Sequence, residues 1–211
     1  ESRGNPELTP QFTNSFEVNY TRTTKIGAVT SGIFYRRISD EISRVVFVDP
    51  NNPNRTILSY DNFDNNDAFG FETSGNLKFT KWWSVNASAD VYFKTVKGTV
   101  QNGETGDFEN AAVDVTNFNA RLNNNFTATE NLRFQLFGMY RGQDLSLQYT
   151  RKPMYKMDFG ATYNVLKGKG TITARLNDVF ENMRFAFDGD VPYRQYGAFY
   201  WESQTFYIGF N

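Results

Sequence analysis

Apolar and polar residues alternate along much of this chain, and a period of two indicates β-strands rather than helices. Between Val85 and Phe93 every second residue is apolar, and Asn86, Ser88 and Asp90 stand among the residues that separate them. The same alternation recurs over 132–141 and 157–165. The sequence therefore predicts an all-β, antiparallel protein whose sheet has one apolar and one polar face.

The alternating segments predict nine strands, and several are longer than the ~5–6 residues usual in globular sheets. Their lengths suit a tilted strand that crosses a bilayer in ~9–11 residues. The predicted ranges are 12–23, 26–39, 67–80, 83–97, 112–127, 131–144, 154–166, 170–181 and 202–210.

The connections between these strands alternate in length. Tight turns are predicted at 23–25, 80–82, 128–130 and 167–169. Longer polar loops are predicted at 40–66, 97–110, 145–153 and 182–201. Short turns at one end and long loops at the other are typical of a transmembrane β-barrel of the bacterial outer membrane.

Composition excludes several classes of protein. The chain has no cysteine and no histidine, which removes thiolate chemistry and the commonest general base and zinc ligand. Its formal net charge of -1 argues against a nucleic-acid partner. The longest apolar run, 45–48, is far too short for a transmembrane helix. The sequence contains no nucleophile–base pair, phosphate-binding loop or metal cluster, so we expect neither an enzyme nor a bound cofactor.

Charged residues gather in one phase of the alternation, whereas the other phase is almost free of them. In a large barrel the charged phase lines a water-filled or plug-filled lumen, and in a sandwich it faces bulk solvent. We favour the lumen. The arginines of this set would line a substrate path or contact a plug, and pairing with Glu17, Glu72 and Asp158 is the alternative. The candidate lumen-facing residues are Glu17, Glu72, Asp90, Arg121, Arg133, Arg141, Asp158 and Arg175, with Lys78 and Lys156 in the same phase.

Aromatic residues make up 17% of the chain, and many stand near the predicted strand ends. Amphipathic rings are favoured at the membrane–water interface, so we predict an interfacial belt rather than simple packing at hairpin ends. The candidate belt residues are Phe79, Trp82, Trp83, Phe126, Tyr163, Tyr200 and Trp201.

Two acidic patterns invite other interpretations. Residues 61–67 carry oxygen ligands at spacings similar to those of calcium loops, but the later glutamate of an EF-hand is missing, so a solvated loop is favoured. Residues 49–54 read as an exposed loop tip. Asp90 and Asp158 would suit a carboxylate pair of a glycosidase only if the fold brought them together.

An odd number of strands cannot close an ordinary bacterial barrel, which has an even number. Unpaired edges in lipid leave backbone groups unsatisfied at several kcal/mol each. The chain also begins without the features of a signal peptide. We therefore expect residues 1–211 to be the C-terminal part of a larger barrel.

Four segments carry a resemblance to a known family. Residues 4–17 are similar to its G-N-P-x-L-x-P-E-x-x-x-x-F-E segment, with Gln11 in place of the glutamate, and 68–72 are similar to the G-x-E start of a later strand. Residues 176–182 resemble its N-x-F-(N/D) motif, and 205–211 its last strand. In this order and spacing, the segments resemble the C-terminal barrel of TonB-dependent receptors and the related outer-membrane β-barrel family common in Bacteroidota.

The resemblance implies a barrel of about 22 strands with an N-terminal plug, of which this chain would form the last two-fifths. It implies location in the outer membrane and import of a bulky nutrient. The expected partners are outer-membrane lipid, the plug and N-terminal strands outside this sequence, TonB, and a surface lipoprotein or other outer-membrane subunits. The alternatives are a barrel that scaffolds a complex without transport, and a secreted β-sandwich that binds a ligand.

Overall fold

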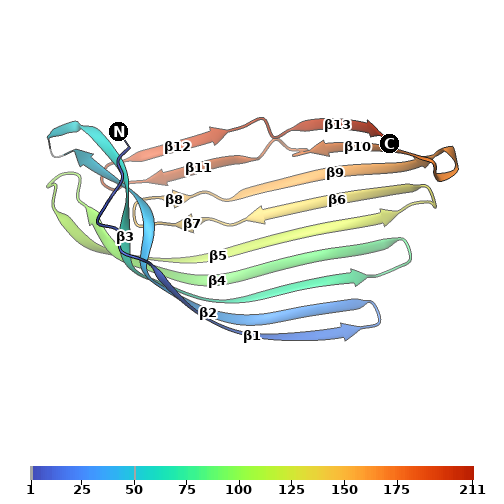
Figure 1. Ribbon diagram of the computed structural model, residues 1–211, viewed down its shortest axis with the longest axis horizontal. Helices are drawn as coiled ribbons and strands as arrows, with labels where there is room; N and C mark the ends of the chain where they lie inside the picture. The colour runs from blue at the N-terminus through green and yellow to red at the C-terminus, as the bar shows by residue number, and fades with distance from the viewer. Residues whose placement is uncertain (1, 50) are drawn as a thin grey trace.

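The computed structural model describes residues 2–49 and 51–211, apart from the side chains of Pro53 and Asp64. The described chain forms a large antiparallel sheet and a smaller one that continues from its loop end (Figure 1). No helix in the described residues is long and apolar enough to cross a membrane. The prediction of an all-β antiparallel protein is therefore confirmed.

The large sheet has nine strands in the order β1-β2-β3-β4-β5-β6-β9-β10-β13, so β1 and β13 are its edges (Figure 1). All nine strands lie in one continuous sheet rather than in two facing layers, which argues against the sandwich. The strands are β1 (Phe12–Thr24), β2 (Gly27–Asp49), β3 (Asn52–Lys78), β4 (Trp83–Gln101), β5 (Phe108–Thr127), β6 (Leu132–Arg141), β9 (Met154–Val165), β10 (Gly170–Asn177) and β13 (Thr205–Phe210).

Tight turns join neighbouring strands at one end of the sheet, where threonine hydroxyls replace missing backbone partners. Thr80 Oγ1 accepts a hydrogen bond from the backbone N–H of Trp83 at 3.0 Å, and Thr129 Oγ1 does the same for Leu132. Such side-chain-to-backbone bonds favour turns over continued strands. The turn predicted at 167–169 is a single 3-10 turn, η1 (Leu166–Gly168).

The loop prediction for 40–66 is wrong, because β2 and β3 continue there as a paired hairpin, with Val45 opposite Ser59. Val45 and Phe63 are each only 2% exposed and pack with Val96, Val100 and Leu147. Both faces of 45–48 are at least partly covered, so this stretch reads as a continuous apolar run rather than an alternation. Asp40, with a φ of 54°, marks where β2 passes beyond β1.

The other predicted loops also contain strands. The smaller sheet has the order β12-β11-β8-β7 and is built from segments expected to be irregular. The predicted loop at 97–110 shortens because β4 and β5 pair as far as Gln101 and Phe108. The strands of the smaller sheet are β7 (Asp144–Leu145), β8 (Thr150–Arg151), β11 (Arg184–Gly189) and β12 (Gln195–Tyr200).

Side-chain amides hold in place the part of the β2–β3 hairpin formed by 40–66, which we call the outer hairpin. Gln148, in the turn between β7 and β8, accepts from Val46 N at 2.8 Å and donates to Val46 O at 2.9 Å. Gln101 accepts from Val48 N at 2.9 Å. On the other edge of the hairpin, Arg3 N donates to Leu58 O (2.9 Å). Both edges of the hairpin are thus anchored to segments distant in sequence.

The register of the nine strands sorts side chains onto an apolar face and a polar face. One row of the apolar face crosses five strands as Val18, Ile33, Phe71, Val91 and Phe118. A row that contains Arg37 and Asp67 bounds this face toward the outer hairpin. Large exposed apolar surfaces of this kind mark contact with lipid or another protein. A second row of the apolar face runs Leu136, Phe159, Leu176 and Phe206.

Candidate functional site: the polar face and its arginines

The charged residues predicted to face the lumen share the polar face of the sheet. One row of register partners runs Glu72, Asp90, Asn119 and Arg141 across β3 to β6. Arg121 lies opposite Ser88 and Met139 in the next row. Contact of the polar face with a lumen stays a prediction. The strand pairing places the other predicted residues on this face as well. They are Glu17, Lys78, Arg133, Lys156, Asp158 and Arg175.

Ion pairs engage Glu17 and Asp158 of this face but not four of its arginines. Asp158 pairs with Lys156 at 3.0 Å, and Glu17 pairs with Arg36 at 3.7 Å. In the described part of the chain no carboxylate lies within ion-pair distance of the four guanidinium groups of Arg121, Arg133, Arg141 and Arg175. Among the described residues, the alternative that Glu17, Glu72 and Asp158 pair with these arginines is therefore not what the structure shows.

These arginines line several recesses, two of which combine them with an acidic residue. The first, of about 540 Å³, lies over β4, β5 and β6 and is lined by Asp90, Asn119, Arg121 and Arg141, among others. The second, of about 320 Å³, is lined by Arg175 beside Asp158, Gln135 and Phe137. Both volumes fall within or near the ~300–1,000 Å³ of small-molecule sites.

Asn119 of the first recess orients the carboxylate of Asp90. Its Nδ2 donates to Asp90 Oδ2 at 2.8 Å, which fixes the orientation of the amide. Its buried Oδ1 has no hydrogen-bond partner among the described residues. The recess thus combines two guanidinium groups that have no carboxylate partner among the described residues with the carboxylate of Asp90, which Asn119 orients. Sequence reasoning did not single out Asn119, because only the register shows it between Asp90 and Arg141.

A second polar cluster connects the large sheet to the smaller one. Asp144 of β7 lies 3.5 Å from Lys94 Nζ of β4 and 4.0 Å from Arg151 Nη2 of β8. Arg151 also donates to Gly142 O at 3.1 Å. Burial and the nearby Arg141 lower the pKa of Arg151, whereas Asp144 raises it. These contacts fix the β7–β8 turn against the polar face.

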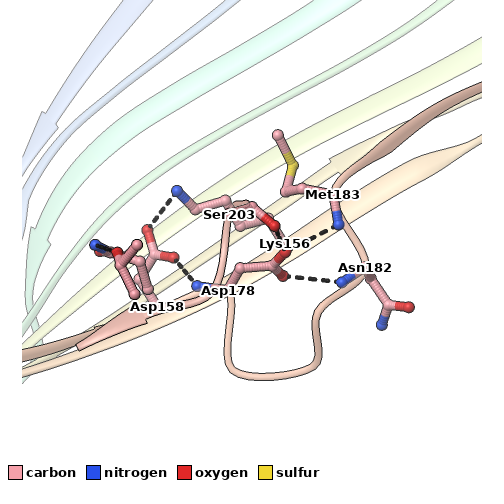
Figure 2. A network of polar contacts seen from close by, with 8 residues as sticks. Lys156, Asp158, Asp178, Asn182, Met183 and Ser203 are labelled. Atoms are coloured by element: carbon pink, nitrogen blue, oxygen red, sulfur yellow. Dashed lines mark hydrogen bonds and ion pairs between the residues drawn. The ribbon is translucent and has the colours of Figure 1, made fainter. Parts of the chain in front are cut away.

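Asp178 forms a buried clasp just beyond β10 (Figure 2). Its carboxylate is fully buried and accepts hydrogen bonds from Ser203 Oγ at 2.6 Å, Met183 N at 2.9 Å and Asn182 N at 3.2 Å. Its own backbone N–H donates to Asp158 Oδ1 at 2.8 Å. The clasp joins the connection between β10 and β11 to the connection between β12 and β13.

The contacts of this clasp lower the pKa of Asp178. Burial raises the pKa of this carboxyl, but the hydrogen bonds from Ser203, Met183 and Asn182 and the charge of Lys156 outweigh it, so the pKa lies below its usual value. Residues 176–182, which resemble a family motif, include Asp178, whereas Ser203 lies outside that segment and was not predicted.

The predicted aromatic belt divides into two regions. Phe79, Trp82, Trp83 and Phe126 cluster at the turn ends of β3, β4 and β5, with the rings of Phe79 and Trp83 4.6 Å apart. Tyr163 lies on the apolar face of β9, opposite Leu132 and Ile172. Tyr200 ends β12 and Trp201 follows it, so both belong to the smaller sheet and its exit. Contact of these rings with a membrane interface stays a prediction.

The acidic patterns are also placed by the fold. Residues 61–67 form part of β3 rather than a loop, and no metal-binding group of three acidic side chains occurs among the described residues. Asp49 and Asn52 end paired strands, whereas Pro50 and the side chains of Pro53 and Asp64 lie outside the described part. Asp90 and Asp158 stand on β4 and β9 with β5 and β6 between them, so they form no carboxylate pair.

Comparison with known proteins gives a family for the whole chain. Residues 1–211 match the model of a family described as outer membrane protein beta-barrel. No curated protein matches the sequence. The crystal structure of the ferric-catecholate import receptor Fiu from E. coli K12, in its open form, is similar at 13% identity with a TM-score of 0.44. The match covers 90% of this chain and 36% of that receptor, so the chain spans about a third of its length.

Proposed function

Because the chain belongs to the outer membrane protein β-barrel family, we propose that it forms part of the wall of a larger outer-membrane barrel that imports a bulky nutrient. The observation that carries the proposal is the division of one sheet into an apolar face and a recessed polar face with unpaired arginines. A wall that encloses a hydrophilic path needs both faces, because lipid contacts one and the solute contacts the other.

Further strands would complete the barrel. In this chain β1 and β13 are the edges of the nine-stranded sheet, and unpaired edges in lipid leave backbone groups unsatisfied. We propose that N-terminal strands of the same protein pair with these edges and that its plug occupies the space over the polar face. TonB would then energise import through the plug.

Uptake measurements test this proposal. Cells that contain the full-length protein are compared with cells that lack it for growth on a panel of nutrients, with and without a proton-motive force. We expect growth on at least one bulky nutrient to require both the protein and the proton-motive force. Equal uptake by both strains across the panel would contradict import.

A scaffold without transport is the second candidate, and the smaller sheet favours it. Its edge strand β12 exposes Tyr196, Phe199 and Tyr200, at 78%, 61% and 69% of their surfaces. Exposed aromatic residues are enriched at protein–protein interfaces, so a surface lipoprotein or another outer-membrane subunit would fit here. Isolation of a stoichiometric complex in mild detergent, together with unchanged nutrient uptake in the deletion strain, would favour this candidate over import.

A further inference from the structure

We propose that the recess over β4, β5 and β6 binds an anionic group, a carboxylate or a phosphate, of the nutrient that the barrel imports. The inference rests on the proposed import function, because it names the chemical class of solute that the polar face would take. Two features of the recess support it: two arginines without a carboxylate partner among the described residues, and the size of the space.

The arginines supply the site for the anionic group. Arg141 lies opposite Asn119, and Arg121 lies opposite Met139, two residues before Arg141 on the same face of β6. The two arginines are therefore diagonal neighbours, about 7–8 Å apart at the backbone. Guanidinium groups bind carboxylate and phosphate oxygens in a bidentate manner, and neither arginine has a carboxylate partner among the described residues. Two such forks at this spacing can hold one oxyanion between them.

The other polar groups of the recess limit the charge of the ligand and offer partners to its neutral part. Asp90 and Tyr92 also line the recess and offer further partners for hydroxyls. Asp90 offsets one of the two positive charges, so the lining favours a ligand with few negative charges.

The size of the recess suits one anionic unit of the nutrient, because its volume of about 540 Å³ matches a small-molecule group. Met139 and Met154 also line the recess and present apolar surface to the C–H groups of a sugar ring. Acidic side chains of the plug are the competing occupants of the same arginines, and the experiment below separates the two.

The test is calorimetric titration of the full-length protein in detergent with glucuronate, glucose 6-phosphate and glucose. We expect the acidic sugars to bind and glucose to bind at least tenfold more weakly. Arg121→Gln and Arg141→Gln should each weaken binding of the acidic sugars by about tenfold or more, since hydrogen bonds to charged groups contribute about 1.5–3 kcal/mol. Arg141→Lys keeps the charge but loses the fork, and should retain part of the affinity.

Arg36→Gln is the matched control. Arg36 shares the polar face, but it pairs with Glu17 and lies on β2, away from the recess, so its loss should leave binding unchanged. Retained resistance to unfolding in each variant shows that the barrel remains intact. Binding of the two acidic sugars separately tells a carboxylate preference from a phosphate preference.

Several outcomes would overturn the proposal. Equal binding of glucose and glucuronate would remove the role of charge, and unchanged affinity in the double Arg121→Gln, Arg141→Gln variant would remove this site. Absence of binding, with plug carboxylates seated between the two arginines in a structure of the full-length protein, would assign the arginines to the plug. Sugar binding without any uptake would sustain the site and contradict the import function, so the two failures are distinguishable.

Discussion

Ser203 Oγ donates a hydrogen bond of 2.6 Å to the buried carboxylate of Asp178, which lies 25 residues earlier in the chain. Ser203 lies between β12 and β13, and Asp178 lies between β10 and β11. One carboxylate therefore holds together the two connections through which the large sheet passes into the smaller one (Figure 2).

Replacement of Asp178 should weaken this junction. Asp178→Asn keeps the shape but turns one acceptor into a donor, so at least one of the donors from Ser203, Asn182 and Met183 loses its partner. A buried polar group left unpaired costs about 1–3 kcal/mol, and more when a charge is involved. Urea unfolding of the full-length protein in lipid vesicles measures the loss. Ser203→Ala removes one donor only and should destabilise less; an equal or greater loss in Ser203→Ala would contradict the clasp.

The clasp should also make stability depend on pH. The folded pKa of Asp178 lies below the value of about 3.9 for an unpaired aspartate. Its stabilising contribution is therefore complete above that unfolded pKa and is lost as the pH falls through the folded pKa. The difference in unfolding free energy between wild type and Asp178→Asn should be constant near neutral pH and shrink in acid. A difference that grows on acidification would contradict a lowered pKa of Asp178 in the folded protein.

A charge on the apolar face should disturb insertion into the membrane. Ala87 lies between Gly75 and Leu122 on the apolar face of β4. Arginine near the bilayer midplane of a barrel costs about 2–4 kcal/mol, so Ala87→Arg should lower stability in lipid by that amount. The control is Asn86→Arg, one residue away on the polar face, where the change should be small. Equal folding of the two variants in lipid would refute the assignment of the faces.

Loss of the glutamine contact should loosen the outer hairpin. The Gln148 side chain bonds both the N–H and the C=O of Val46, which lies 102 residues away. Gln148→Ala leaves both backbone groups without these partners, at a local cost of about 1–3 kcal/mol. Hydrogen exchange of peptides from 40–66 should become faster, while exchange in β9 and β10 stays the same. Replacement of the exposed Gln143 by alanine serves as the control and should leave the hairpin protected.

Much of the large sheet was predictable because strand period is a local property. The alternation from Val85 to Phe93 identified β4 and its two faces. Residues paired with them on β3 and β5 point to the same face, so the assignment extends to the neighbouring strands. The tight turns followed from polar breaks such as Thr80 and Thr129. The candidate charged residues likewise share one face, because residues two apart in a strand always do.

Other features depend on contacts between distant segments. The sequence by itself determined the all-β class, the nine wall strands, their apolar and polar faces and the family, since each is written in residues that are close together in the chain. Only the tertiary structure decided that 40–66 is a hairpin, that Asp178 meets Ser203, and that Asp158 pairs with Lys156 rather than with an arginine of the polar face. Burial on both faces hides strand period, and the partner of a side chain is set by which strands pack together.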